Sequence, residues 1–150
     1  MSTTDILNVE SLIPHRGRML LVDEILSITD DQATVLSVTH DQWPMYDNGT
    51  INPLILVELV AQAAGVHNSL KRIDPHGQGE PTRGWLVGVK SAQFHVASIA
   101  SGETITTTTT NAFVFDNLRE IRGTATIGGQ LAADVVLQIV EAQPEEIAES

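Results

Sequence analysis

The chain contains no cysteine, and this absence removes several kinds of chemistry. Disulfide bonds, thiolate metal sites and cysteine nucleophiles are excluded, and we expect a cytoplasmic location. The sequence also lacks a run of about 18 apolar residues, the length that a membrane-spanning helix requires. Its first residues lack the basic and apolar regions of a signal peptide. We therefore expect a protein that neither crosses a membrane nor is exported.

Basic residues are also scarce. Eight Lys and Arg residues stand against 19 Asp and Glu residues, which gives a formal net charge of −11. This balance argues against nucleic acid as a partner, because binding to the phosphate backbone needs a basic surface. Any anionic partner would have to meet a local cluster of the few basic side chains, among them Arg16, Arg18, Lys71 and Arg72.

The most informative segment that is present runs from Asn52 to Gly65 and is apolar on nearly every helical face, which predicts a buried helix. Asn52 is typical of an N-cap and Pro53 of a first helical position, and we expect the helix to end near Arg72. One carboxylate, Glu58, lies in the middle of the apolar run. Burial of an unpaired carboxylate is costly, so Glu58 is either a hydrogen-bonded structural group or a poised acid or base.

Strand patterns lie on both sides of this helix, within 150 residues of which 42% are hydrophobic. The expected strands are residues 19–29, 33–39, 85–94, 104–115, 118–127 and 130–140, with loops at 41–52 and 74–84. Gly128-Gly129 predicts a two-residue hairpin turn. One flat sheet face cannot cover a helix that is apolar all round, so the pattern predicts an α+β fold in which a curved antiparallel sheet wraps one long central helix. We expect residues 1–150 to form a single domain with a frayed tail at 141–150.

Three motifs resemble the FabZ-type 3-hydroxyacyl-[acyl-carrier-protein] dehydratases. They are LIPHRGRMLLVD at 12–23, the helix at 53–65 with Glu58 and Ala-Gln-Ala, and LVGVKSAQF at 86–94 followed by Ser-Gly-Glu at 101–103. They occur in the same order as in that family, and the resemblance as a whole covers roughly residues 6–140. The loop Asp47-Asn48-Gly49 is similar to that of a divergent branch, the dehydratase-like proteins encoded among aryl-polyene and polyketide genes.

The resemblance implies a hotdog fold and a dimer whose two sheets join edge to edge, with the active site between protomers. It implies a substrate acyl chain held as a thioester on the phosphopantetheine of acyl carrier protein or coenzyme A, with no other cofactor. It also implies loss of water from a 3-hydroxyacyl group in fatty-acid or polyketide-type biosynthesis. A loop His takes the C2 proton, and a carboxylic acid with a pKa raised by burial helps the hydroxyl leave. Backbone N–H groups at the helix start polarise the thioester carbonyl.

Carried over residue by residue, Glu58 takes the position of the family's carboxylate. Leu54 replaces the usual glycine at the helix start, and we expect its N–H to remain available. The family's His lies about eight residues before the helix proline, and counting back from Pro53 leads to Met45. The catalytic candidates are therefore Glu58 and, as a substitute base, His40.

The other candidates are less specific. Gln62 lies one turn beyond Glu58, where it either orients the carboxylate or has a helix-surface or dimer-contact role. His15 is interpreted as a packing or capping residue, and His67 lies at least two turns from Glu58. The histidines lack metal-ligand spacing, so we expect no metal. The candidate substrate-binding residues, several of which are equally typical of a core, are Leu54, Gln62, Trp43, Met45, Gly88 and Phe94.

Three functions remain open. The first is a dehydratase-like homodimer or higher homo-oligomer in which the basic residues named above meet the acidic carrier protein. The second is a non-catalytic subunit that forms a heterodimer with a His-bearing paralogue and completes its site. The third is an acyl thioesterase in which Glu58 acts as a base or nucleophile and no His is required.

Overall fold

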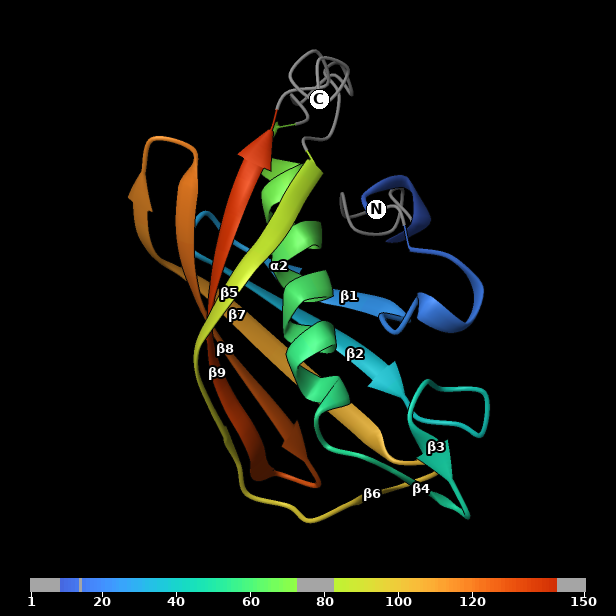
Figure 1. Ribbon diagram of the computed structural model, residues 1–150. Coiled ribbons are helices and arrows are strands. Elements are labelled where there is room, and N and C mark those ends of the chain that lie inside the picture. Colours follow the sequence, from blue (N-terminus) through green and yellow to red (C-terminus); the bar gives the residue numbers. More distant parts are fainter. Residues whose placement is uncertain (1–8, 14, 73–82, 143–150) are drawn as a thin grey trace.

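The computed structural model describes residues 9–13, 15–72 and 83–142, and its main feature is a curved antiparallel sheet of six strands (Figure 1). The strand order is β1-β2-β7-β8-β9-β5. The strands are β1 (Glu24–Ile28), β2 (Gln32–Val38), β5 (Arg83–Phe94), β7 (Thr104–Phe115), β8 (Leu118–Ile127) and β9 (Gln130–Ala142). The predicted sheet around a central helix is therefore confirmed.

The helix α2 (Ile55–Arg72) lies on the concave side of this sheet, as Figure 1 shows. Its start confirms the predicted cap, because the Asn52 side-chain Oδ1 accepts a hydrogen bond from the Leu54 N–H at 3.0 Å. Leu56, Leu59 and Val60 are fully buried between the helix and the sheet. These contacts fix the helix, and with it Glu58, relative to the rest of the chain.

Replacing the cap residue tests this start of the helix. We expect Asn52→Ala to lower the free energy of unfolding by about 1 kcal/mol, the usual cost of losing an N-cap side chain. Asn52→Asp keeps an oxygen acceptor at the same place and is expected to remain close to wild type. Urea denaturation of the three proteins measures the difference, and equal midpoints for Asn52→Ala and wild type would contradict the assignment.

The expectation that α2 is buried on every face is wrong for one stripe. Leu54 is 51% exposed, and Val57, Glu58, Ala61 and Gly65 are only partly buried. Their spacing places all five on one side of the helix. Within the described residues, nothing covers this stripe completely. An apolar stripe of this kind is typical of a surface that a partner covers.

On the opposite side, the helix approaches the sheet at Gly123 of β8. A Cβ atom on Gly123 would lie 2.3 Å from the Val60 Cγ1. Glycine has no Cβ atom, so only glycine leaves room for the Val60 side chain here. Its presence lets α2 pack closely against β8.

Several boundaries differ from the prediction. Residues 17–19 form a 3-10 turn, η2 (Gly17–Met19), so the first strand begins only at Glu24. The expected loop 41–52 contains two short strands, β3 (Tyr46–Asp47) and β4 (Thr50–Ile51), which form a small second sheet with β6 (Ile99–Ala100). The structure also has a 3-10 turn, η1, at Val9–Ser11.

The turn and tail predictions have mixed outcomes. Gly128 and Gly129 both have positive φ and join β8 to β9, which confirms the hairpin turn. Strand β9 continues to Ala142, two residues into the segment expected to be frayed. The rest of that tail, 143–150, and most of the expected loop 74–84 lie outside the described residues.

Candidate active site

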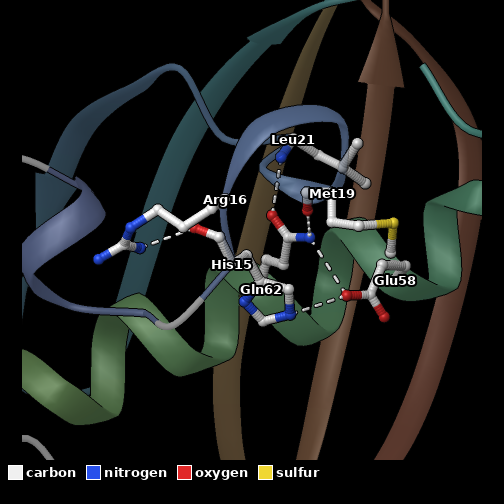
Figure 2. A network of polar contacts seen from close by, with 6 residues as sticks. All are labelled: His15, Arg16, Met19, Leu21, Glu58 and Gln62. Carbon is white, nitrogen blue, oxygen red and sulfur yellow. Dashed lines mark hydrogen bonds and ion pairs between the residues drawn. The ribbon is translucent and has the colours of Figure 1, made fainter. Parts of the chain in front are cut away.

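The carboxylate of Glu58 receives two hydrogen-bonding partners, and both contact the same oxygen. Gln62 Nε2 donates to Glu58 Oε1 at 3.1 Å, and His15 Nε2 lies 3.0 Å from the same atom. Figure 2 shows the second carboxylate oxygen pointing away from both partners. The side chain is 30% exposed, so it stays within reach of solvent on the open stripe of α2.

Gln62 is held on its other side by the backbone of the N-terminal segment. Its Oε1 accepts the Leu21 N–H at 2.9 Å, and its Nε2 also donates to the Met19 carbonyl at 2.6 Å. The residue is fully buried. Its amide orientation is thus fixed by two backbone groups, and a fixed amide holds Glu58 in place. Of the two roles considered for Gln62, the structure shows the contact with Glu58.

His15 reaches Glu58 because the segment that carries it is tied down locally. The Arg16 guanidinium donates to the carbonyls of Ile13 and His15, each at 2.7 Å, and to that of Glu10 at 2.6 Å. The interpretation of His15 as a packing or capping residue missed this contact. The signal that was available is the lone carboxylate in an apolar helix, which needs a donor from elsewhere in the chain.

The electrostatics of Glu58 differ from the expectation. Burial raises the pKa of its carboxyl, but the hydrogen bonds from His15 and Gln62 and the charge of His15 outweigh that effect. The pKa of Glu58 therefore lies below its ordinary value of 4.5 in this single chain. The expectation that burial raises it overall is wrong here, because two N–H donors stabilise the ionised form.

The expectation that the Leu54 N–H at the start of the helix remains available is wrong. That N–H donates to Asn52 Oδ1, and the next two, on Ile55 and Leu56, donate to the carbonyls of Asn52 and Pro53. An acyl thioester could use the Leu54 N–H only after displacing the Asn52 cap.

Met45, the residue at the counted position of the family's His, has an unusual backbone. Its φ is +67°, in the left-handed region that residues with a Cβ rarely adopt. Its carbonyl accepts the Asn52 N–H at 3.2 Å, and its side chain is 47% exposed. This hydrogen bond places the backbone of Met45 beside Asn52, the residue that caps the start of α2.

The remaining sequence candidates lie elsewhere. Trp43 is 2% exposed and belongs to the core. Of the two roles left open by the sequence, substrate binding and core packing, the structure shows core packing. His40 packs edge-on against Trp43, and its Nδ1 accepts the Gln42 N–H at 3.1 Å. Its role as a base stays a prediction. His67 is buried, and its Nε2 lies 2.9 Å from the Thr29 carbonyl oxygen, a contact that anchors the helix.

Gly88 and Phe94 lie on β5, one of the two edge strands of the sheet. The β5–β9 pairing is irregular beside Gly88, and Phe94 ends the strand with its side chain partly exposed. Their proposed contact with substrate remains a prediction. Among the described residues, no group of three His, Cys, Asp or Glu side chains is arranged to hold a metal ion. Nor does the described part of the chain contain a helix long and apolar enough to cross a membrane.

The sheet wrapped around α2 is a hotdog fold, and solved structures with this fold match the chain closely. In the dehydratase heterocomplex ApeI:P from Xenorhabdus doucetiae, one chain superposes with a TM-score of 0.84 at 17% identity, over 95% of this chain and 96% of that one. A hypothetical thioesterase from Streptococcus pneumoniae, solved with coenzyme A, gives a TM-score of 0.62 at 12% identity, over 79% and 84% of the two chains.

The chain is a dehydratase-like hotdog protein related to FabZ. The family model described as ApeP dehydratase matches residues 7–149, and the chain belongs to this ApeP-like family. Among curated proteins it is similar to the 3-hydroxyacyl-[acyl-carrier-protein] dehydratase FabZ of Coxiella burnetii, with 26% identity over 147 residues, 94% of this chain and 99% of the relative. A FabZ from Streptococcus pneumoniae is also 26% identical, over 89% of this chain and 94% of that protein.

Proposed function

We propose that this chain is the carboxylate-bearing subunit of a dehydratase that acts on 3-hydroxyacyl thioesters of acyl carrier protein. The observation that carries the proposal is the state of Glu58. One of its oxygens is held by His15 and Gln62, while the other points away from both, on a stripe of α2 that the described residues leave partly open. A fixed carboxylate with one free oxygen on an apolar surface is suited to proton transfer in a shared site.

The second subunit in this proposal is a paralogous hotdog chain that supplies an imidazole. Met45 stands where the FabZ family has its loop His, and His40 is engaged in local contacts with Gln42 and Trp43. The solved ApeI:P heterocomplex is an example of two different dehydratase chains in one assembly. Strand β5 is one of the two edge strands of the six-stranded sheet and exposes Val89 and Phe94, which suits edge-to-edge pairing.

The proposed reaction breaks the C2–H and C3–O bonds of the substrate and forms the C2=C3 double bond. The partner's imidazole accepts the C2 proton, the protonated Glu58 donates its proton to the C3 hydroxyl, and water leaves. Covering the open stripe removes water from Glu58, and this strengthens the burial effect that raises its pKa. Assembly therefore favours the acid form that the reaction needs. No cofactor takes part in this scheme beyond the phosphopantetheine of the substrate.

The carrier protein is proposed to approach along the N-terminal segment. Arg16 and Arg18 are exposed there, on either side of Gly17 and next to His15. Arg18 Nε donates to the Gln42 carbonyl at 3.0 Å, which joins the segment to the loop that carries His40 and Met45. An acidic carrier would thus meet positive charge at the edge of the site. The side chains of Lys71 and Arg72 lie outside the described residues. The complex would work in the cytoplasm, in fatty-acid or polyketide-type biosynthesis.

Thioester hydrolysis is the second candidate, because a hypothetical thioesterase from Streptococcus pneumoniae shares the fold and one oxygen of Glu58 points away from its two partners. An ionised carboxylate can act as a base or nucleophile without an imidazole. Release of free thiol from acyl-coenzyme A by the chain alone, lost in Glu58→Gln, would support hydrolysis over dehydration.

Co-purification tests the subunit proposal. The tagged chain is expressed with a hotdog paralogue from the same organism that carries His at the position of Met45. We expect a stable complex with both chains in native mass spectrometry. Glu58→Gln should assemble equally well, because the carboxylate serves chemistry rather than assembly. A chain that forms homo-oligomers and leaves the paralogue unbound would overturn the proposal.

A further inference from the structure

The two carboxylate oxygens of Glu58 have unequal surroundings. His15 and Gln62 both contact Oε1, and Figure 2 shows no contact from the labelled residues to Oε2. A carboxylate has two oxygens of equal basicity unless its surroundings distinguish them. Here two N–H groups on one oxygen make the distinction, since a proton on Oε1 would compete with both donors.

We propose that His15 is a positioning residue that, together with Gln62, occupies Oε1 of Glu58 and so assigns proton transfer to Oε2. This inference rests on the proposed function, since it names the oxygen that serves the reaction. This placement of His15 needs no second subunit. The Arg16 guanidinium donates hydrogen bonds to three backbone carbonyls of the same segment and so fixes its conformation.

The geometry assigns His15 to positioning rather than to direct catalysis. Its Nε2 faces Glu58 at 3.0 Å, and an ionised carboxylate can only accept, so Nε2 carries the proton of this contact. The other ring nitrogen, Nδ1, is buried and has no hydrogen-bond partner in the described part of the chain. One nitrogen is engaged and the other is shielded, so neither is placed to take a proton from a substrate.

The charges around Glu58 are compatible with a dominant effect of His15. It is the titratable group whose charge acts on the carboxylate. Arg16 and Arg18, on the same segment, direct their guanidinium groups to backbone carbonyls. Lys90, on β5, is paired with Glu120. Removing the His15 imidazole should therefore raise the pKa of Glu58, because none of these three cations is placed to replace its charge.

Carbon-13 NMR of the side-chain carboxyl of Glu58 tests this in the purified full-length chain, with the signal assigned by its loss in Glu58→Gln. In His15→Leu, the hydrogen bond and the nearby charge that lower the pKa of Glu58 are both gone, while burial still raises that pKa. We expect the titration midpoint of Glu58 to move to higher pH than in wild type. His15→Gln restores a side-chain N–H without charge and is expected to fall between the two.

His95→Gln is the matched control, because it removes the imidazole of another His–carboxylate pair, His95 with Asp134 at 3.3 Å. It should leave the Glu58 midpoint unchanged. If His15→Leu is folded by circular dichroism and its Glu58 titrates as in wild type, the inference is overturned. The readout needs no turnover, so a failure of the proposed dehydratase activity is seen separately.

The catalytic consequence is measured in the complex with the paralogue. We expect His15→Leu to lower kcat roughly tenfold to a hundredfold with little change in KM, because a misplaced acid slows the chemical step more than binding. The limb of the pH profile on which Glu58 loses its proton should move to higher pH. Unchanged kcat and an unmoved limb would overturn the positioning role.

Discussion

Glu58→Gln should reduce dehydration by the assembled complex by about 10²–10⁴-fold, the usual contribution of a general acid or base. Gln has nearly the same shape and can still accept from Gln62 and His15, but it cannot donate an acidic proton. The loss should appear in kcat, measured as formation of the enoyl thioester from a 3-hydroxyacyl carrier protein.

Glu24→Gln is the control for this experiment. Glu24 is an exposed carboxylate on β1, at the opposite edge of the sheet from β5. Its replacement removes the same charge and is expected to leave kcat unchanged. A Glu58→Gln complex that turns over at the wild-type rate would show that the carboxylate is structural, the alternative that the sequence left open.

The second large effect concerns the fold. Gly123→Ala should lower the free energy of unfolding by about 1–3 kcal/mol, the range for an overpacked core. The added methyl group would lie 2.3 Å from the Val60 Cγ1 and 2.9 Å from its Cγ2, so either the helix or the strand has to shift. Thermal and urea unfolding measure the change.

Two further variants show whether the contact with Val60 is the cause. At Gly88, a new Cβ would have its nearest neighbour, the Gln138 Oε1, at 3.4 Å, so Gly88→Ala should be nearly neutral. Val60→Ala leaves room beside Gly123, and the double variant should therefore be less destabilised than the sum of the two single changes. Strict additivity would contradict the proposed clash.

Much of the fold could be predicted because its signals are local. Asn52-Pro53 marks the start of a helix through the chemistry of the first turn, and Gly128-Gly129 marks a hairpin because both residues need positive φ. The long apolar helix between strand patterns indicated the wrapped sheet. Short strands such as β3 and β4 were missed, because a two-residue strand has no period to detect.

The site could be predicted only in part. Glu58 was found because a carboxylate in an apolar helix is unusual, and Gln62 because it lies one turn away. The contact of His15 with Glu58 joins segments far apart in the chain, and no local pattern encodes it. The sequence could not show the exposed stripe either. In the sequence, apolar residues of a surface that a partner covers look the same as apolar residues of the core.

The most direct test of the central claim is to compare turnover of a 3-hydroxyacyl carrier protein by the purified chain alone and by its complex with the His-bearing paralogue. Loss of one water from the acyl group is followed by intact-mass spectrometry. We predict dehydration by the complex and none by the isolated chain. Full dehydration by the isolated chain would contradict it and would mean that His40 or another group of this chain serves as the base.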